Sequence, residues 1–316
     1  MYLFDERRCA STARWSAFAI AVCCLPALLI CAGGTLARPQ AGGGSGVLEA
    51  TSGLGRKLYA LPDDKAVLSG QKQLAADPRN AGLALAVSQT EAGQRQYREA
   101  IATCTKALEF APKNAALYLE RGHRELGLRE FTAGTRDLEQ AAALDPKKME
   151  VFYHLGLAHY FQSHFDAAAD SFRKALSLAS NNDGVIDASN WLYVSLRRAG
   201  KQEEAAQALK RITPDMKNIE PHYYFYLQLL RFYQGAVSEK DVLPPKPANP
   251  SDVESELAFD TISYGVGNWK LYNHDTKGAR ELFTQVVEGN AWNAWGFVGA
   301  ETDLVRLKGK SGAAAR

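Results

Sequence analysis

The sequence predicts an all-α fold: a helical-repeat solenoid of about five to six helix pairs, closed by a C-terminal capping helix. Proline, an aromatic residue and a small residue each recur three times at intervals of 34 residues. These positions are Pro78, Pro112 and Pro146; Tyr97, Phe131 and Phe165; and Ser88, Gly122 and Gly156. A period of about 34 residues is typical of a helix–turn–helix unit, which buries its apolar face by stacking on the next unit.

Composition and charge narrow the classes of partner. The chain has 316 residues, of which 46% are hydrophobic and 23% charged, as in an ordinary globular protein. Its 37 basic and 35 acidic residues give a net charge of +2, which is too balanced to favour nucleic acid as a partner. We therefore expect a protein or peptide partner, with self-association through an exposed edge as an alternative.

Residues 1–37 have the pattern of an export signal. Three arginines precede an apolar run at 17–32, and small residues up to Ala37 suit cleavage there. The run is shorter than the roughly 20 residues that a spanning helix needs, and it contains Pro26. We expect an exported protein, periplasmic or secreted, without an integral membrane span in the mature chain. The alternative is a protein anchored in the membrane by residues 17–32.

Cysteine usage agrees with a stack held together by packing. Four of the five cysteines lie within residues 1–37, which leaves Cys104 in the mature chain. An exported protein with one cysteine has no internal disulfide, so helix packing must supply its stability. Cys104 falls in the repeat column of Leu138 and Phe172. We therefore expect a small buried hydrophobe rather than a reactive thiol.

The first two thirds of the chain divide into a linker and repeats. Residues 38–46 are a glycine-rich linker, and repeats are expected over 47–234. Three units are clear, at 81–114, 115–148 and 149–182.

The last third is less regular. Four prolines predict an extended loop over 235–255, followed by a final repeat with its capping helix over 256–308 and a disordered tail over 309–316. In the capping helix we expect an apolar inner face and a polar outer face. The inner residues are Trp295, Phe297, Leu304 and Leu307, and the outer residues are Glu301, Asp303 and Arg306.

The repeat columns resemble those of a known family. Unit 149–182 has an aromatic residue near its start, then a Leu-Gly pair, and then aromatic residues and alanines at helical spacing. These residues are Phe152, Leu155, Gly156, Phe165, Ala168, Phe172 and Ala175. On them the chain resembles the tetratricopeptide repeat family, over roughly residues 63–308, and in particular exported bacterial members. The resemblance implies a solenoid fold and says little about the partner.

The resemblance also implies a binding groove. In tetratricopeptide repeat proteins the first helix of each unit lines a concave face, and here that face would mix aromatic and polar side chains, which suits a bound peptide or helix. The implied groove residues are Gln89, Leu119, His123, Glu150, Tyr153, Leu157, Tyr160, Phe161, Asn190, Arg197, Arg198, Tyr264, Asn268 and Tyr272. Ordinary packing between units is the alternative role for the aromatic members.

Arg121, His123 and Arg124 form a further candidate site. Arg121 stands in a column that is apolar in other units, and a buried cation without a partner is costly. Either the three residues clamp an acidic or C-terminal carboxylate group of a partner, or Arg121 forms an internal salt bridge. The candidate internal partners are Glu91, Glu125 and Asp137.

No pattern for catalysis or metal binding is found. His154, His159 and His164 are spaced by five residues, which turns successive side chains by roughly 140° and keeps them off one helix face. The chain has no HExxH, phosphate loop, nucleophile elbow or paired-cysteine site. We therefore expect no catalytic residues, no metal, no cofactor and no enzymatic activity.

These features predict a non-enzymatic scaffold or adaptor of the bacterial cell envelope, which binds protein or peptide partners along a concave groove. The alternative is a binder or sensor of a small ligand such as a glycan or peptidoglycan fragment. A helix at 221–234 that is rich in Tyr and Phe favours this alternative, because aromatic faces can stack on a sugar.

Overall fold

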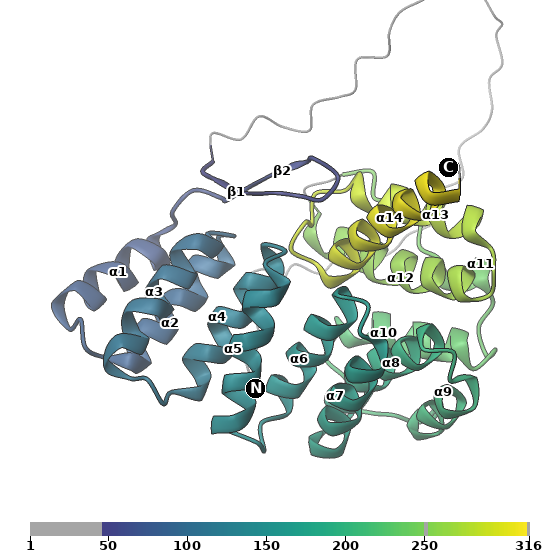
Figure 1. The fold of residues 1–316 in the computed structure, drawn as a ribbon, viewed down its shortest axis with the longest axis horizontal. Helices are drawn as coiled ribbons and strands as arrows, with labels where there is room; N and C mark the ends of the chain where they lie inside the picture. The colour runs from purple at the N-terminus through teal and green to yellow at the C-terminus, as the bar shows by residue number, and fades with distance from the viewer. Residues whose placement is uncertain (1–45, 250–251, 315–316) are drawn as a thin grey trace, which may run out of the picture. The chain divides into compact units, whose positions relative to one another are not determined.

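Helices account for most of the chain that the structure describes. This computed structural model describes residues 46–249 and 252–314, and these residues belong to one compact unit (Figure 1). In chain order the elements are β1 (Leu48–Thr51), β2 (Lys57–Tyr59), α1 (Lys65–Ala76), α2 (Ala81–Gly93), α3 (Tyr97–Phe110), α4 (Ala115–Gly127), α5 (Phe131–Leu144), α6 (Met149–Phe161), α7 (Phe165–Leu178), α8 (Asn182–Arg198), α9 (Gln202–Ala208), the 3-10 helix η1 (Leu209–Arg211), α10 (Tyr223–Tyr233), α11 (Glu239–Val242), α12 (Val253–Tyr272), α13 (Thr276–Val287) and α14 (Trp295–Ala314).

The helices pair as the 34-residue period predicts, which confirms the all-α repeat fold. The pairs α2–α3, α4–α5 and α6–α7 occupy the three clear units. The turn inside each pair holds Arg95, Arg129 or Ser163, and all three have positive φ. Such a conformation is uncommon outside glycine, so its return every 34 residues shows that the same turn joins each pair.

The first helices of the pairs form an inner row. Neighbouring helices among α2, α4, α6 and α8 contact one another, whereas each second helix packs mainly against the first helices beside it in the chain. The C-terminal helices lie against this inner row, because α12 contacts α8 and α14 contacts α6. The chain therefore folds its own end back onto the side that a partner would enter.

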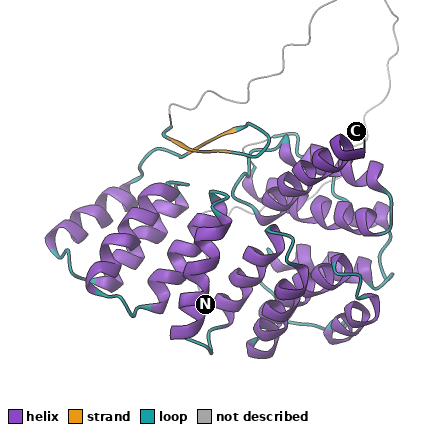
Figure 2. Cartoon of the chain, in the orientation of Figure 1, coloured by secondary structure: helices purple, strands orange, loops and turns teal. Residues whose placement is uncertain are grey.

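Residues 47–62 form a hairpin rather than part of a helical repeat. Strands β1 and β2 are antiparallel, with Leu48 opposite Tyr59, and they are the two strands seen in Figure 2. Leu58 is buried while its neighbours Lys57 and Tyr59 face solvent. This alternation has the period of a strand, and it explains why helical repeats begin only at α1.

The expected boundaries in the last third also change. The proline-rich segment contains the short helix α11, and α12 starts at Val253, within the predicted loop. Helix α14 continues through the predicted tail to Ala314, since adding residues to an existing helix is much easier than starting one. The targeting segment 1–37 and the linker up to Ser45 lie outside the described residues.

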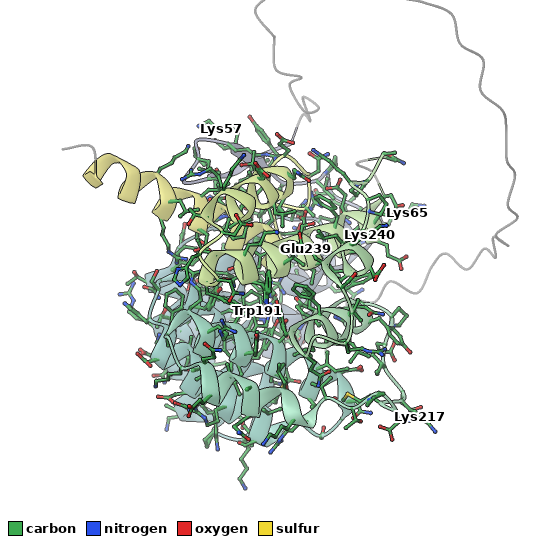
Figure 3. All side chains as sticks on the ribbon, turned by 90° about the vertical axis from the view of Figure 1, so that its right-hand side faces the viewer. Lys57, Lys65, Trp191, Lys217, Glu239 and Lys240 are labelled. Atoms are coloured by element: carbon green, nitrogen blue, oxygen red, sulfur yellow. The ribbon has the colours of Figure 1, made fainter. Side chains whose placement is uncertain are left out.

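The core depends on close approach between paired helices. Trp191, labelled in the interior of Figure 3, is 2% exposed and stacks on Phe172 with ring centroids 6.1 Å apart. The Phe172 ring in turn fills the space beside Gly156, where an added Cβ would lie 2.7 Å from the ring. The small-residue column of the sequence therefore marks real helix–helix contacts.

Cys104 is buried, as expected. Its thiol donates a hydrogen bond to Ser88 Oγ at 3.2 Å. Burial raises the pKa of the thiol to about 12, so it stays protonated and unreactive at neutral pH.

Replacing Gly156 by Ala should destabilise the fold by about 1–3 kcal/mol, because the new methyl group overlaps the Phe172 ring. Gly93→Ala is the matched control, since a Cβ at this last residue of α2 meets nothing within 4 Å. Urea unfolding measures both. Equal midpoints for the two variants would show that α6 and α7 are not in close contact at Gly156.

Candidate functional site

The inner face of the stack is occupied by the chain's own C-terminal helix. Trp295, the first residue of α14, lies 5.2 Å from the His123 ring of α4 and 5.9 Å from the Phe161 ring of α6. Further along α14, Arg306 donates hydrogen bonds to the main-chain carbonyls of Tyr160 and Phe161. Helix α14 thus covers the part of the inner face that α4 and α6 contribute.

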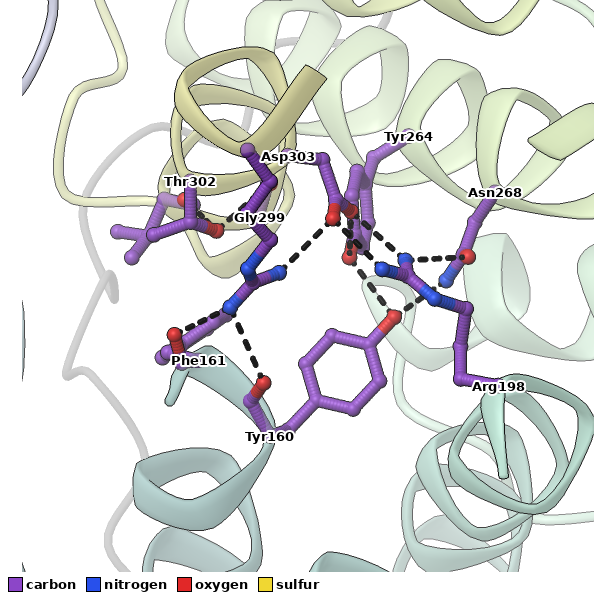
Figure 4. A network of polar contacts seen from close by, with 10 residues as sticks. Tyr160, Phe161, Arg198, Tyr264, Asn268, Gly299, Thr302 and Asp303 are labelled. Atoms are coloured by element: carbon purple, nitrogen blue, oxygen red, sulfur yellow. Dashed lines mark hydrogen bonds and ion pairs between the residues drawn. The ribbon is translucent and has the colours of Figure 1, made fainter. Parts of the chain in front are cut away.

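A buried carboxylate holds this arrangement together (Figure 4). Asp303 of α14 is 1% exposed and accepts two hydrogen bonds from the Arg198 guanidinium, at 2.9 and 3.0 Å. It accepts another from Arg306 at 2.8 Å. Burial by itself would raise the pKa of Asp303, but the charge of Arg198 and the hydrogen bonds outweigh it and keep the pKa below its usual value. The carboxylate therefore remains charged between two cations.

Two tyrosines and an asparagine extend the network. The hydroxyl groups of Tyr160 and Tyr264 are hydrogen-bonded at 2.9 Å, and Tyr264 also donates to Asp303 at 3.2 Å. Asn268 donates from its amide to the Tyr160 hydroxyl, and its carbonyl oxygen accepts from Arg198 at 3.1 Å. Side chains from α6, α8, α12 and α14 therefore meet in one hydrogen-bonded cluster, which we call the groove network.

A second cluster fastens the hairpin and the repeat turns to the C-terminal helices. Arg129, from the turn after α4, pairs with Glu301 of α14 at 2.9 Å and donates to the Trp292 carbonyl. Glu301 also accepts from the backbone N–H of Gly53. Arg56 donates to the carbonyls of Val287, the last residue of α13, and of Gly289 just after it. The N-terminal hairpin is thus tied to residues more than 230 positions away along the chain.

Most of the predicted groove residues come together, but as interior residues. The described chain buries Tyr153, Leu157, Tyr160, Phe161, Asn190, Tyr264 and Asn268. Arg198 binds Asp303, while Arg197 lies over the Tyr272 ring at 4.3 Å, away from the groove network. The open groove expected over these positions is therefore wrong: α12 and α14 fill it. A role in binding a partner stays a prediction for these residues.

The Arg121 site resolves in favour of the internal salt bridge. Its guanidinium donates to both carboxylate oxygens of Asp137, at 2.5 and 2.8 Å. Arg124, three residues further along α4, pairs with Glu120 at 2.7 Å. Both cations are thus already engaged by carboxylates of this chain.

His123 forms part of a partly buried aromatic cluster. Its ring lies 4.2 Å from the His154 ring, and both contact Trp295. Burial, together with the nearby charge of Arg124, holds the pKa of His123 well below its usual value, and burial lowers the pKa of His154 to about 4. The pair is therefore neutral and packs as an apolar surface for α14.

Asp303, Glu301 and Arg306 were expected on the outer side of α14, and this prediction was wrong. Asp303 and Glu301 are 1% and 2% exposed because α14 is enclosed on two sides, by the inner row and by α12. The sequence signal that could have found them is the recurrence of Arg95 and Arg129 at one turn position, since both donate to carbonyls of the loop before α14.

The aromatic helix α10 offers little room for a sugar. Tyr226 and Tyr233 line a cavity of about 10 Å³ shared with α8 and α12, which holds about one water molecule. Asn190 Oδ1 and the Tyr233 hydroxyl reach this region without a hydrogen-bond partner in the described chain. On α10, Tyr224 is the large aromatic residue that stays exposed.

The described residues contain neither a membrane-spanning helix nor a group of metal ligands. Across 46–249 and 252–314, no helix is both long and apolar enough to cross a membrane. Within the same residues, no three histidine, cysteine, aspartate or glutamate side chains are grouped as metal ligands would be.

Part of the chain is similar to a family of known proteins. The sequence model of a family described as "Tetratricopeptide repeat" matches residues 119–183, which run from α4 into the start of α8. The matched residues are thus similar to tetratricopeptide repeats, and the helix pairs on both sides of the match continue the same α-solenoid. A search of curated proteins found no match.

Solved structures align with parts of the chain at low similarity. A crystal structure of MamA is 20% identical, covers 54% of this chain and 90% of its own, and has a TM-score of 0.42. A second MamA structure is 21% identical, covers 58% and 87%, and has a TM-score of 0.41. YrrB, titled a TPR protein with an unusual peptide-binding site, is 16% identical, covers 67% and 100%, and has a TM-score of 0.44.

Asp303→Asn should lower the free energy of unfolding by about 3–5 kcal/mol, because it removes a buried charge and leaves the partly exposed Arg198 and Arg306 without their counter-charge. Asp170→Asn is the control. Asp170 makes an exposed ion pair with Arg173, and its loss should cost less than about 1 kcal/mol. Similar losses in the two variants, by urea denaturation, would contradict a buried groove network.

Stability should fall in acid through the histidine pair. The folded pKa values of His123 and His154 lie below the value of about 6.5 in the unfolded chain, so the unfolded chain binds protons first. The contribution of the two neutral histidines to the free energy of unfolding is therefore complete above a pH of about 6.5, and it is lost as the pH falls toward 4.

His154→Gln should make the free energy of unfolding depend less steeply on pH. The slope should decrease by up to about 1.4 kcal/mol for each pH unit between the folded and the unfolded pKa of His154, where the unfolded parent binds a proton and the folded parent does not. Free energies of unfolding at several pH values between 7 and 4 test it. The carboxyl groups titrate in both proteins, so the difference between the two curves isolates the histidine. Parallel curves would show that His154 is not buried against α14.

Proposed function

We propose that this protein is a non-enzymatic scaffold that binds a peptide or helix of a partner protein on the part of its inner face that α14 leaves uncovered. Equivalent positions of successive repeats carry the argument. Leu85, Leu119 and Tyr153 occupy one such column, and the first two are partly exposed while Tyr153 is buried. The inner face therefore opens toward the N-terminal end of the stack.

The uncovered surface is small and mainly apolar. On α2, Ala86 is exposed and both Leu85 and Gln89 are partly exposed. Small side chains let another backbone approach closely, and Gln89 can satisfy a polar group of the partner. This combination suits the apolar stripe of a helix or an extended peptide. Repeat solenoids commonly use such concave surfaces for binding.

We also propose that the protein works in the bacterial cell envelope, as an exported scaffold. The support is the sequence of residues 1–37, with its arginines, its short apolar run and its small residues before Arg38. The lone Cys104 of the rest of the chain, buried and unpaired, is compatible with an oxidising compartment, because burial keeps its thiol from reacting.

Ala86→Arg should abolish capture of the protein partner by residues 38–316 in a native pull-down from envelope extract, because a long cation then projects into the proposed contact. Ser177→Arg is the control, with the same new side chain at an exposed position of the outer helix α7. Both variants should keep the parent's melting temperature. Capture that is unchanged by Ala86→Arg would remove α2 from the binding surface, and a parent that captures no protein would contradict the scaffold.

A further inference from the structure

The hairpin β1–β2 gathers exposed apolar side chains that the fold does not use. Of the eight large hydrophobic side chains that the described residues leave exposed, five lie between 47 and 68. Four of these belong to the hairpin or its two ends, and we call them the hairpin face: Val47, Leu48, Tyr59 and Leu61. Leu48 and Tyr59 are direct cross-strand partners and are 44% and 41% exposed. Such a concentration on one small element marks an interaction surface.

The hairpin is held firmly from its other side. The Arg98 guanidinium donates to the Glu49 carbonyl, and the Arg98 backbone N–H donates to the Glu49 carboxylate at 2.8 Å. Trp292 donates from its indole to the Tyr59 carbonyl at 3.3 Å. Main-chain groups at both strands are therefore already engaged, so side-chain contact, rather than addition of another strand, is the way this hairpin can bind.

The hairpin lies close in the chain to the apolar run at 17–32, and this indicates which surface its exposed side chains contact. The apolar run at 17–32 ends 14 residues before Gly46, so the connection spans at most about 50 Å. If the protein is exported as proposed, the run engages a membrane, and the hairpin is the first described element that follows it. A retained run would keep the hairpin within that distance of the bilayer, and a cleaved run would bring the hairpin to the bilayer surface during export.

We propose that the hairpin face docks on a lipid bilayer, with Leu48 and Tyr59 at the centre of the contact. Leucine and valine side chains enter the boundary between headgroups and acyl chains, and the tyrosine ring suits that boundary because it has an apolar body and a polar tip. Lys57, labelled at the top edge of the molecule in Figure 3, can reach lipid phosphates while its stem stays on apolar surface. The inference rests on the export part of the proposed function.

Vesicle flotation tests the proposal directly. Residues 38–316, which contain the compact unit, should float with vesicles of phosphatidylethanolamine and phosphatidylglycerol. The double variant Leu48→Ser, Tyr59→Ser should bind about tenfold more weakly or worse, because it removes both central apolar side chains. The matched control is Tyr224→Ser, Val253→Ser, which removes a tyrosine and an aliphatic residue that are 47% and 49% exposed elsewhere. The control should float like the parent.

Three results would overturn the proposal. The parent could stay in the soluble fraction, or the two double variants could bind vesicles equally. Binding of the parent could also disappear at about 0.5 M salt, which would indicate attraction between charges alone. The envelope pull-down separates this test from the scaffold itself. If the parent does not float and the hairpin variant loses the protein partner that the parent captures, the hairpin face binds that partner and not lipid. A parent that floats but captures no protein would support the membrane contact and contradict the scaffold.

Discussion

The fold depends on one buried carboxylate that two arginines neutralise. Asp303 joins Arg198 of the inner row to Arg306 of its own helix and accepts a further hydrogen bond from Tyr264 of α12, whose hydroxyl is in turn bonded to that of Tyr160 of α6. A buried charge must be matched closely, so this cluster permits one arrangement of four helices and penalises others. It fixes α14 inside the superhelix, and the remaining features of the inner face follow from that position.

The enclosed helix divides the inner face by accessibility. Along α6 and α8 the chain's own C-terminal helices cover the side chains that a partner would contact. Along α2 the corresponding side chains remain accessible. The turn arginines Arg95 and Arg129 and the hairpin residue Arg56 reinforce this closure from the N-terminal side. A stack that could have stayed an open spiral is thereby tied across its ends, which limits both its flexibility and the length of peptide it can hold.

The repeat fold could be predicted because each unit carries its own local signals. Pro112, Gly156 and Phe172 report on packing within one or two units, and those contacts recur at a fixed spacing. The closure of the stack could not be predicted in the same way. Asp303 and Glu301 look like solvent-facing residues of an amphipathic helix, and only their partners, 105 and 172 residues away, show that they are buried. The hairpin was missed because strands this short leave only a brief alternation in the sequence.

Amide hydrogen exchange of α14 under native conditions tests the central claim most directly. If α14 is held within the superhelix by Asp303, its amides between Trp295 and Leu307 should exchange as slowly as those of α6, through the same cooperative opening. Exchange of this segment many times faster than α6, while α6 and α8 stay protected, would show that α14 leaves the groove on its own and would contradict the account.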